Sequence, residues 1–98
     1  MLQITPVFYE HVALVLLDQL HGEGYFSGSF EFDFGSVSCR MVLSAVVHYH
    51  ANDPAVGYSG EVKDVVPVWW EFHTTTDDGE VLNDFSFNEL RNLIKQSL

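Results

Sequence analysis

Among the residues of this 98-residue chain, the five histidines have the side chains best suited to chemistry. His48, His50 and His73 fall with Glu71 on one side of a predicted sheet, and imidazole and carboxylate groups are zinc ligands. Strand register argues against a shared site, because His73 would lie about eleven residues along its strand from the partner of His48, on the order of 35 Å. A smaller site of His48, His50 and Glu61 is the alternative. We expect exposed histidines instead, with no metal and no cofactor.

An oxygen-rich segment is the second chemical candidate, and it contains Asp77, Asp78, Glu80, Asn83 and Asp84. It lacks the twelve-residue spacing of a calcium loop, so an acidic hairpin tip followed by a helix entry explains it better. The sequence also has no glycine-rich phosphate loop and no nucleophile elbow. These observations predict no catalytic residues and a protein that is not an enzyme.

Cys39 is the only cysteine, which excludes an internal disulfide. Its phase places it among apolar residues, where a thiol usually acts as a small hydrophobe. The apolar run from Val12 to Leu17 is far too short to span a bilayer, and the first ten residues lack the basic start of a signal peptide. We expect a cytoplasmic protein that does not bind membranes.

The charge balance restricts the possible partners. Four Lys and Arg residues stand against fourteen Asp and Glu residues, a formal net charge of −10. Direct nucleic-acid binding needs a basic footprint, which this composition does not provide. A charged partner would therefore be basic.

The elements that position these side chains are predicted by alternation. Apolar and polar residues alternate with a period of two from Tyr25 to about Phe85, as in half-buried strands. Gly35-Ser36 fits a two-residue type II′ turn, and Asp78-Gly79 predicts a second two-residue turn. Residues 51–60 form the longest irregular segment, and Pro67 suits only an unpaired edge.

Two helices frame the strands. Thr5 and Pro6 have the residue types of an N-cap and first helical position, so the first helix is predicted from about Pro6 to His21. Ser86 and Glu89 form a capping box at the start of the second helix. Arg91 and Lys95 would place positive charge towards its C-terminal end.

The order of elements predicts one α+β domain over residues 1–98. We expect a two-layer sandwich of order α-β-β-β-β-α, in which two helices cover one face of an antiparallel meander. This order resembles the double-stranded RNA-binding domain and, equally, a cystatin-like helix and meander. The former family has a lysine-rich start to its last helix, whereas Phe87-Asn88-Glu89 stands there in this chain, so its function is not carried over.

The same phase predicts the residues that face the helices. The strands are expected to contribute Phe26, Phe30, Phe32, Phe34, Cys39, Met41, Leu43, Val47, Val66, Val68, Trp70 and Phe72. The helices are expected to contribute Leu16, Leu17, Leu20, Leu90 and Ile94.

The face opposite the helices is the most informative surface. Alternation places Val42, Val46, Val65 and Trp69 there as a contiguous apolar patch, and such patches on small domains are often interfaces. A bulge near Asp64 is the alternative, because it would reverse the phase and bury Val65. The residues expected around the patch are Arg40, Glu71 and His48.

Three functions follow in order of preference. The first is a non-enzymatic protein-interaction module, most simply a homodimer that packs its open sheet faces. The second is an acidic inhibitor or immunity-type protein that binds a basic partner or mimics nucleic acid. A small-ligand or metal-dependent enzyme comes last.

Overall fold

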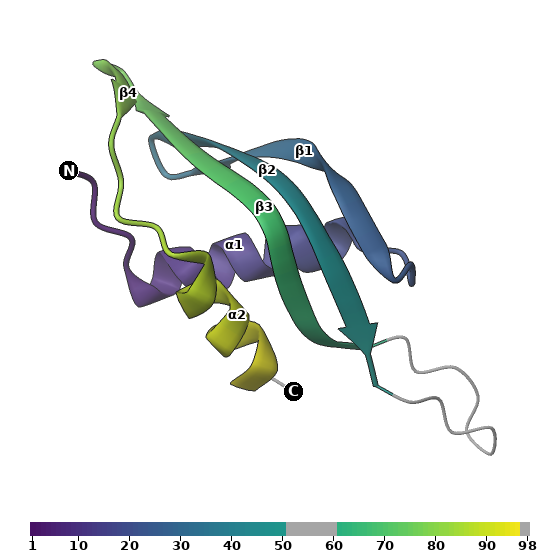
Figure 1. Cartoon of the computed structure of the whole chain (residues 1–98). Helices are drawn as coiled ribbons and strands as arrows, with labels where there is room; N and C mark the ends of the chain where they lie inside the picture. Colours follow the sequence, from purple (N-terminus) through teal and green to yellow (C-terminus); the bar gives the residue numbers. More distant parts are fainter. Residues whose placement is uncertain (51–60, 97–98) are drawn as a thin grey trace.

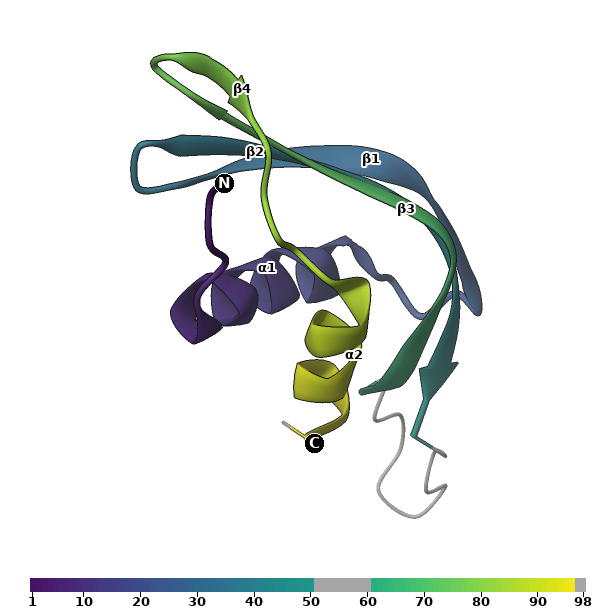
Figure 2. The same cartoon turned by 60° about the vertical axis from the view of Figure 1, so that its left-hand side comes forward.

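A computed structural model of the chain describes residues 1–50 and 61–96 (Figure 1). Within these ranges the elements are α1 Pro6–Gln19, β1 Tyr25–Phe34, β2 Val37–Tyr49, β3 Val62–Thr76, β4 Gly79–Val81 and α2 Phe87–Gln96. The strands form one antiparallel sheet in sequence order, and both helices lie on the side towards which the sheet curves (Figure 2). The α+β meander with two helices on one face is confirmed. The irregular segment predicted at 51–60 lies outside the described residues.

The first helix starts as the sequence predicts and ends slightly earlier. Thr5 is the N-cap, and its hydroxyl oxygen accepts a hydrogen bond of 3.3 Å from the backbone N–H of Phe8. Pro6 occupies the first turn, where a missing N–H costs nothing. The helix ends at Gln19 and not at His21, because Leu20 already has extended backbone angles.

The second helix begins at Phe87, directly after Ser86. The carbonyl of Ser86 accepts backbone hydrogen bonds from Glu89 and Leu90. The backbone N–H of Ser86 donates to the hydroxyl oxygen of Tyr9 at 3.0 Å, so a side chain of α1 satisfies a backbone donor at the start of α2.

The two hairpins differ in how well the sequence predicted them. Phe34 pairs with Val37 across Gly35-Ser36, as expected. Gly35 has φ +59° and no described residue other than glycine has positive φ, which is the pattern of a type II′ turn. In the second hairpin Asp77-Asp78 forms the turn, and Gly79 follows with φ +100°. The predicted Asp78-Gly79 turn is wrong by one residue, because only the glycine adopts the left-handed conformation.

Asn83 connects the end of the sheet to α2. Its side-chain amide donates to the carbonyl of Phe72 at 3.1 Å and to the hydroxyl of Thr74 at 3.0 Å. Its side-chain oxygen accepts a bond of 3.0 Å from the backbone N–H of Phe85. At the point where the chain leaves β4, the side chain of Asn83 thus makes hydrogen bonds to β3 that a further paired strand residue would make with its backbone.

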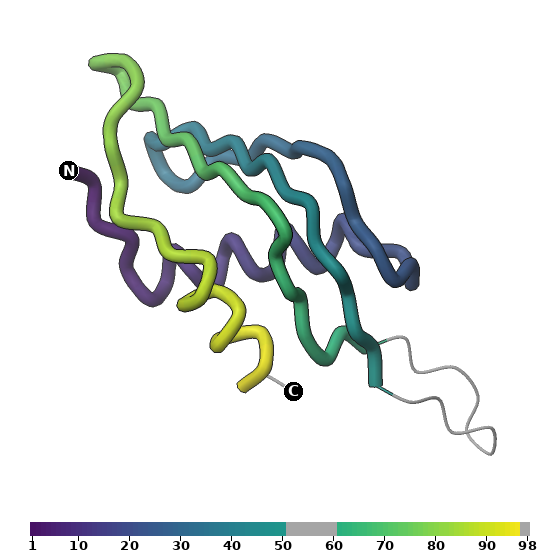
Figure 3. Tube along the Cα trace, viewed as in Figure 1, coloured from purple at the N-terminus to yellow at the C-terminus, as the bar shows by residue number. Residues whose placement is uncertain are grey.

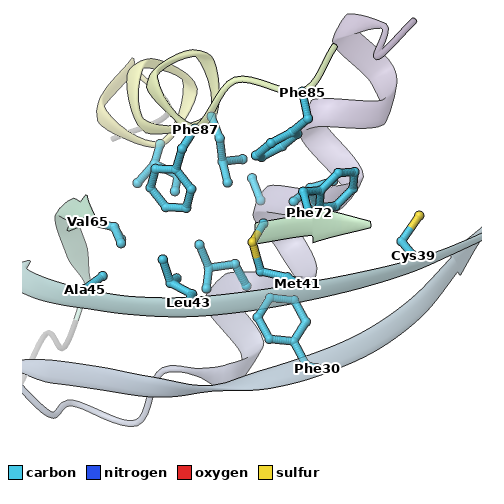
Figure 4. Packing of buried hydrophobic residues seen from close by; sticks show 14 of the residues in the cluster. Phe30, Cys39, Met41, Leu43, Ala45, Val65, Phe72, Phe85 and Phe87 are labelled. Atoms are coloured by element: carbon cyan, nitrogen blue, oxygen red, sulfur yellow. The ribbon is translucent and has the colours of Figure 1, made fainter. Parts of the chain in front are cut away.

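The core lies between the concave side of the sheet and the helices (Figure 4). Aromatic rings dominate one end of it, where Phe8 stacks on Phe34 and Phe72 stacks on Phe85, each at 4.3 Å between centroids. Leucine and valine side chains fill the other end. The buried cluster consists of Ile4, Phe8, Val12, Ala13, Leu16, Phe30, Cys39, Met41, Leu43, Ala45, Val47, Val62, Val65, Phe72, Phe85, Phe87, Leu90 and Ile94.

Most of the predicted core is confirmed, but β3 departs from its expected phase. One register shift, between His48 and Tyr49, lies at Lys63, next to Asp64, where the alternative prediction placed a bulge. At the other shift, Ser44 faces Trp69 whereas its neighbour Ala45 faces Pro67, so Val68 is an extra residue in β3. Such a β-bulge reverses the alternation beyond it and bends the strand. Val68 is 66% exposed instead of buried, and Val65 is fully buried instead of exposed.

The proline of β3 lies where the sequence predicts. Strand β4 pairs only with Thr74–Thr76, which leaves Pro67 on a free edge. Figure 3 shows that β2 and β3 bend together around the helices in this part of the sheet. The open face of the sheet is consequently its convex side (Figure 2).

We expect the bulge to be measurable as a difference between two valine truncations. Val65→Ala should lower the free energy of unfolding by roughly 2 kcal/mol, because it removes buried methyl groups and leaves a cavity. Val68→Ala, three residues away, should cost well under about 1 kcal/mol, since that side chain is largely exposed. Urea unfolding of both variants makes the comparison. Equal losses of unfolding free energy in the two variants would contradict the reversed alternation of β3 at the bulge.

An ion pair ties α2 to β3. Nε of Arg91 donates to Oδ1 of Asp64 at 2.9 Å, and Nη2 donates to Oδ2 at 2.8 Å. The bidentate hydrogen bonds from Arg91 lower the pKa of Asp64, and they outweigh the partial burial of its carboxylate, which acts in the opposite direction. The pair stabilises the fold only while the carboxylate is ionised.

Asp64→Asn should therefore reduce stability by about 1 kcal/mol at neutral pH. A lowered pKa contributes stability above the unfolded value of about 3.9, and this stability is lost as the pH falls through the folded value. The difference between variant and wild type should shrink below about pH 4. Asp18→Asn controls for the loss of one negative charge, because Asp18 is an exposed residue of α1. A difference that persists unchanged at low pH would show that the pair is not the cause.

Candidate interaction surface

The strand register arranges the outward residues of β1, β2 and β3 in rows on the convex face. Each row contains one residue from each strand, and the residues follow directly from the two ladders. The rows are Tyr25 with Val46 and Val66, Ser27 with Ser44 and Trp69, Ser29 with Val42 and Glu71, and Glu31 with Arg40 and His73. Apolar side chains gather in the first three rows and charged ones in the third and fourth.

Trp69 is the most prominent side chain of the face. It is 59% exposed and lies directly beside the bulge residue Val68. The pKa of Glu71 is lowered chiefly by His73, and Trp69, the next outward residue of β3, contributes to the same shift. A large aromatic ring is thus displayed to solvent beside a carboxylate of the same face.

Two of the three predicted patch valines lie on the face, and the assignment of the third is wrong. Val42 is partly exposed and Val46 is 37% exposed. Val65 cannot belong to the patch, because the bulge turns it into the core. Val66 lies on the open face in its place, although the sequence assigned it to the core. We define the open-face patch as Tyr25, Val42, Val46, Val66 and Trp69.

Tyr25 is a patch residue that sequence reasoning missed. Its side chain is 51% exposed, and it lies opposite Val46 at the start of β1. Alternation could have identified it. Tyr25 directly precedes Phe26, which was predicted to face the helices, so Tyr25 falls on the outer face.

The polar side of the face contains the predicted rim residues. Arg40 faces Glu31 on one side and His73 on the other. Nε2 of His73 donates to Oε1 of Glu71 at 2.8 Å, and this bond is the main reason why the pKa of Glu71 is lowered. The charge of Arg40 lowers it further. His48 lies at the other end of the face, opposite Asp64.

The strand register separates the histidines that alternation places on one side of the sheet. His48 faces Asp64 while His73 faces Arg40, so nine residues of β3 separate the two histidines in register. The carboxylate of Asp64 is already paired with Arg91. Within residues 1–50 and 61–96, no three or more His, Cys, Asp or Glu side chains are grouped so that they could hold a metal ion.

Cys39 has the properties of a packing residue. Its side chain is buried in the core, and burial is the main cause that raises the pKa of its thiol to about 11. The thiol is therefore protonated at neutral pH and is a poor nucleophile.

A cavity of about 610 Å³ lies between the two helices, and its polar groups are largely occupied. Tyr9 accepts from Ser86, and the carboxylate of Asp84 accepts from the backbone N–H of Ile4 at 2.7 Å. The remaining carboxylates, Glu10 and Glu89, lie on its lining without a histidine, cysteine or cationic side chain. These contacts join the helices and the N-terminal segment, and they do not form a nucleophile with its base.

Comparison of the chain with protein-family models, with curated proteins and with solved structures finds no match. None of the described helices has the length and apolar character needed to cross a membrane. The physical properties of the convex face are therefore the basis for inferring function.

We expect removal of divalent metals to leave the fold unaffected. Treatment with EDTA should not change the melting temperature by more than about 1 °C, because no metal-binding free energy is coupled to folding. Differential scanning calorimetry of the treated and untreated protein is the measurement. A fall of several degrees that Zn²⁺ reverses would show that the histidines do bind metal.

Proposed function

We propose that this protein is a non-enzymatic interaction module that forms a homodimer through its open sheet face. The observation that carries the proposal is an exposed Trp69 with Val42, Val46 and Val66 in the adjoining rows of the face that the helices leave uncovered. Interfaces commonly have such a centre, with an aromatic anchor and an outer ring of polar residues. The cytoplasmic location expected from the sequence is kept as part of the proposal.

The shape of the face limits the strength of such a dimer. Trp69 and Tyr25 together expose on the order of 200 Å², since each aromatic side chain carries about 150–250 Å². Two convex faces bury less area than two flat faces would, because convex surfaces separate away from their point of contact (Figure 2). The total buried area then falls in the range of weak or transient complexes, below about 1,200 Å². We expect a dissociation constant on the order of 10–100 µM.

Charge opposes the association and makes it sensitive to salt. Each copy carries a formal net charge of −10, so two copies repel one another at low ionic strength. The screening length shrinks from about 30 Å at 0.01 M salt to about 8 Å at 0.15 M. Dimerisation should therefore strengthen as salt is added, which is the opposite of binding to a basic partner.

The test is light scattering on the wild type and on two glutamate variants over 5–500 µM protein. Trp69→Glu should abolish the dimer, because it removes the aromatic anchor and buries a charge at the centre of the contact. Val68→Glu is the matched control, since Val68 is at least as exposed as Trp69 but is not part of the open-face patch. The control should dimerise nearly as the wild type does. Circular dichroism verifies that both variants are folded.

The proposal fails if the wild type is a monomer over this range, or if Trp69→Glu leaves the dimer intact. A monomeric wild type would favour the second candidate, the acidic inhibitor or immunity-type protein. The convex shape and the net charge support that candidate, because a convex surface of an acidic protein can enter a concave basic site. Its complex with a basic protein would weaken steeply as salt rises.

A further inference from the structure

The open face is uneven in height from one edge to the other. On β1 the outward residues between Tyr25 and Glu31 are only Ser27 and Ser29. The hydroxyl groups of Ser27 and Ser44 lie 3.1 Å apart and bond to each other across the strands. On β3, at the same level, Trp69 stands out from the sheet. The face therefore has a low side over β1 and a tall side over β3.

Such a face can be complementary to itself. Two identical faces can meet only if the two-fold axis lies in the plane between them. If that axis runs along β2, β3 of one copy lies over β1 of the second copy. Trp69 then fills the low region above Ser27 and Ser29 of the second copy, and Ser44 faces its own counterpart. If the axis instead runs across the strands, Trp69 meets Trp69 and both low regions remain empty.

The charges agree with the first arrangement. Glu31 on β1 and His73 on β3 lie in the same row, so each would face the other group in the second copy. Glu71 would face the hydroxyl of Ser29, which can donate to it. Arg40 would face Arg40, but a carboxylate from Glu31 lies beside each of them. No carboxylate opposes a carboxylate within these rows.

We infer that the partner of the open face is a second copy of this chain, held by a two-fold axis along β2 with each Trp69 seated over the β1 serines of the other copy. The inference rests on the proposed function and specifies its geometry. The seating explains why a bulky aromatic residue and a run of small polar residues occupy opposite sides of one face.

Pulsed electron–electron distance measurement on a spin label at Ser38→Cys tests the axis. Ser38 is an exposed residue of β2, six positions before Ser44, and it lies outside the open-face patch. With the axis along β2, the two labels face each other across the interface at on the order of 15–25 Å, given about 10 Å between packed sheets. With the axis across the strands, they are separated by about 40 Å, twice the six-residue distance along the strand. Cys39 is buried and its thiol pKa is raised to about 11, so it should stay unlabelled.

Two further variants distinguish this geometry from other dimers. Adding Trp69→Glu to the labelled protein should abolish the distance signal, which ties the signal to the open face. Ser27→Tyr should raise the dissociation constant at least tenfold by filling the low region, whereas Ser36→Tyr in the β1–β2 turn should leave it unchanged. A distance near 40 Å, or full tolerance of Ser27→Tyr, would overturn the inferred geometry. Those results would leave the dimer itself standing, whereas a monomeric wild type would remove both.

Discussion

The β-bulge at Val68 is the constraint on which the rest of the structure depends. The extra residue Val68 bends the two central strands around the helices and reverses the facing of the segment before it. The bend produces a concave side that can enclose two short helices and a convex side that stays uncovered. The reversal supplies Val65 to the core and Val66 to the outer face. The same bulge therefore determines which valine of this segment fills the core and which is exposed on the outer face.

The helices depend on contacts that link distant parts of the chain. The Asp64–Arg91 pair attaches α2 to the segment of β3 that the bulge has turned. Tyr9 bonds to the start of α2, and Asp84 bonds to the backbone before α1. Each of these contacts pairs a charged group or a backbone N–H that has no partner within its own helix or strand. Both helices are thus attached by polar contacts as well as by the apolar core.

Sequence reasoning succeeded where the signal is local and failed where tertiary geometry decides. The Thr5–Pro6 cap and the Gly35-Ser36 turn are specified by a few adjacent residues, and the structure has both. The sequence analysis gave a bulge near Asp64 only as its alternative, and that alternative buries Val65 as the structure does. The bulge at Val68 could not be located, because Val65, Val66, Pro67 and Val68 are all apolar and alternation is silent within such a run. The preferred prediction therefore placed Trp69 correctly on the open face and Val65 wrongly. The Asp64–Arg91 pair joins residues 27 positions apart, a contact that no helical or strand period marks.

Asn83 has a consequence for how copies of this protein can meet. By bonding to the carbonyl of Phe72, its side chain caps the sheet edge just beyond the short β4. Further along, the free edge of β3 contains a bulge and Pro67, which make it a poor template for another strand. Edge-to-edge pairing can repeat without limit and leads towards fibres, whereas a two-fold contact between faces closes after two copies. A side-chain amide, a proline and one extra valine thus oppose open-ended strand pairing along the β3–β4 edge of the sheet.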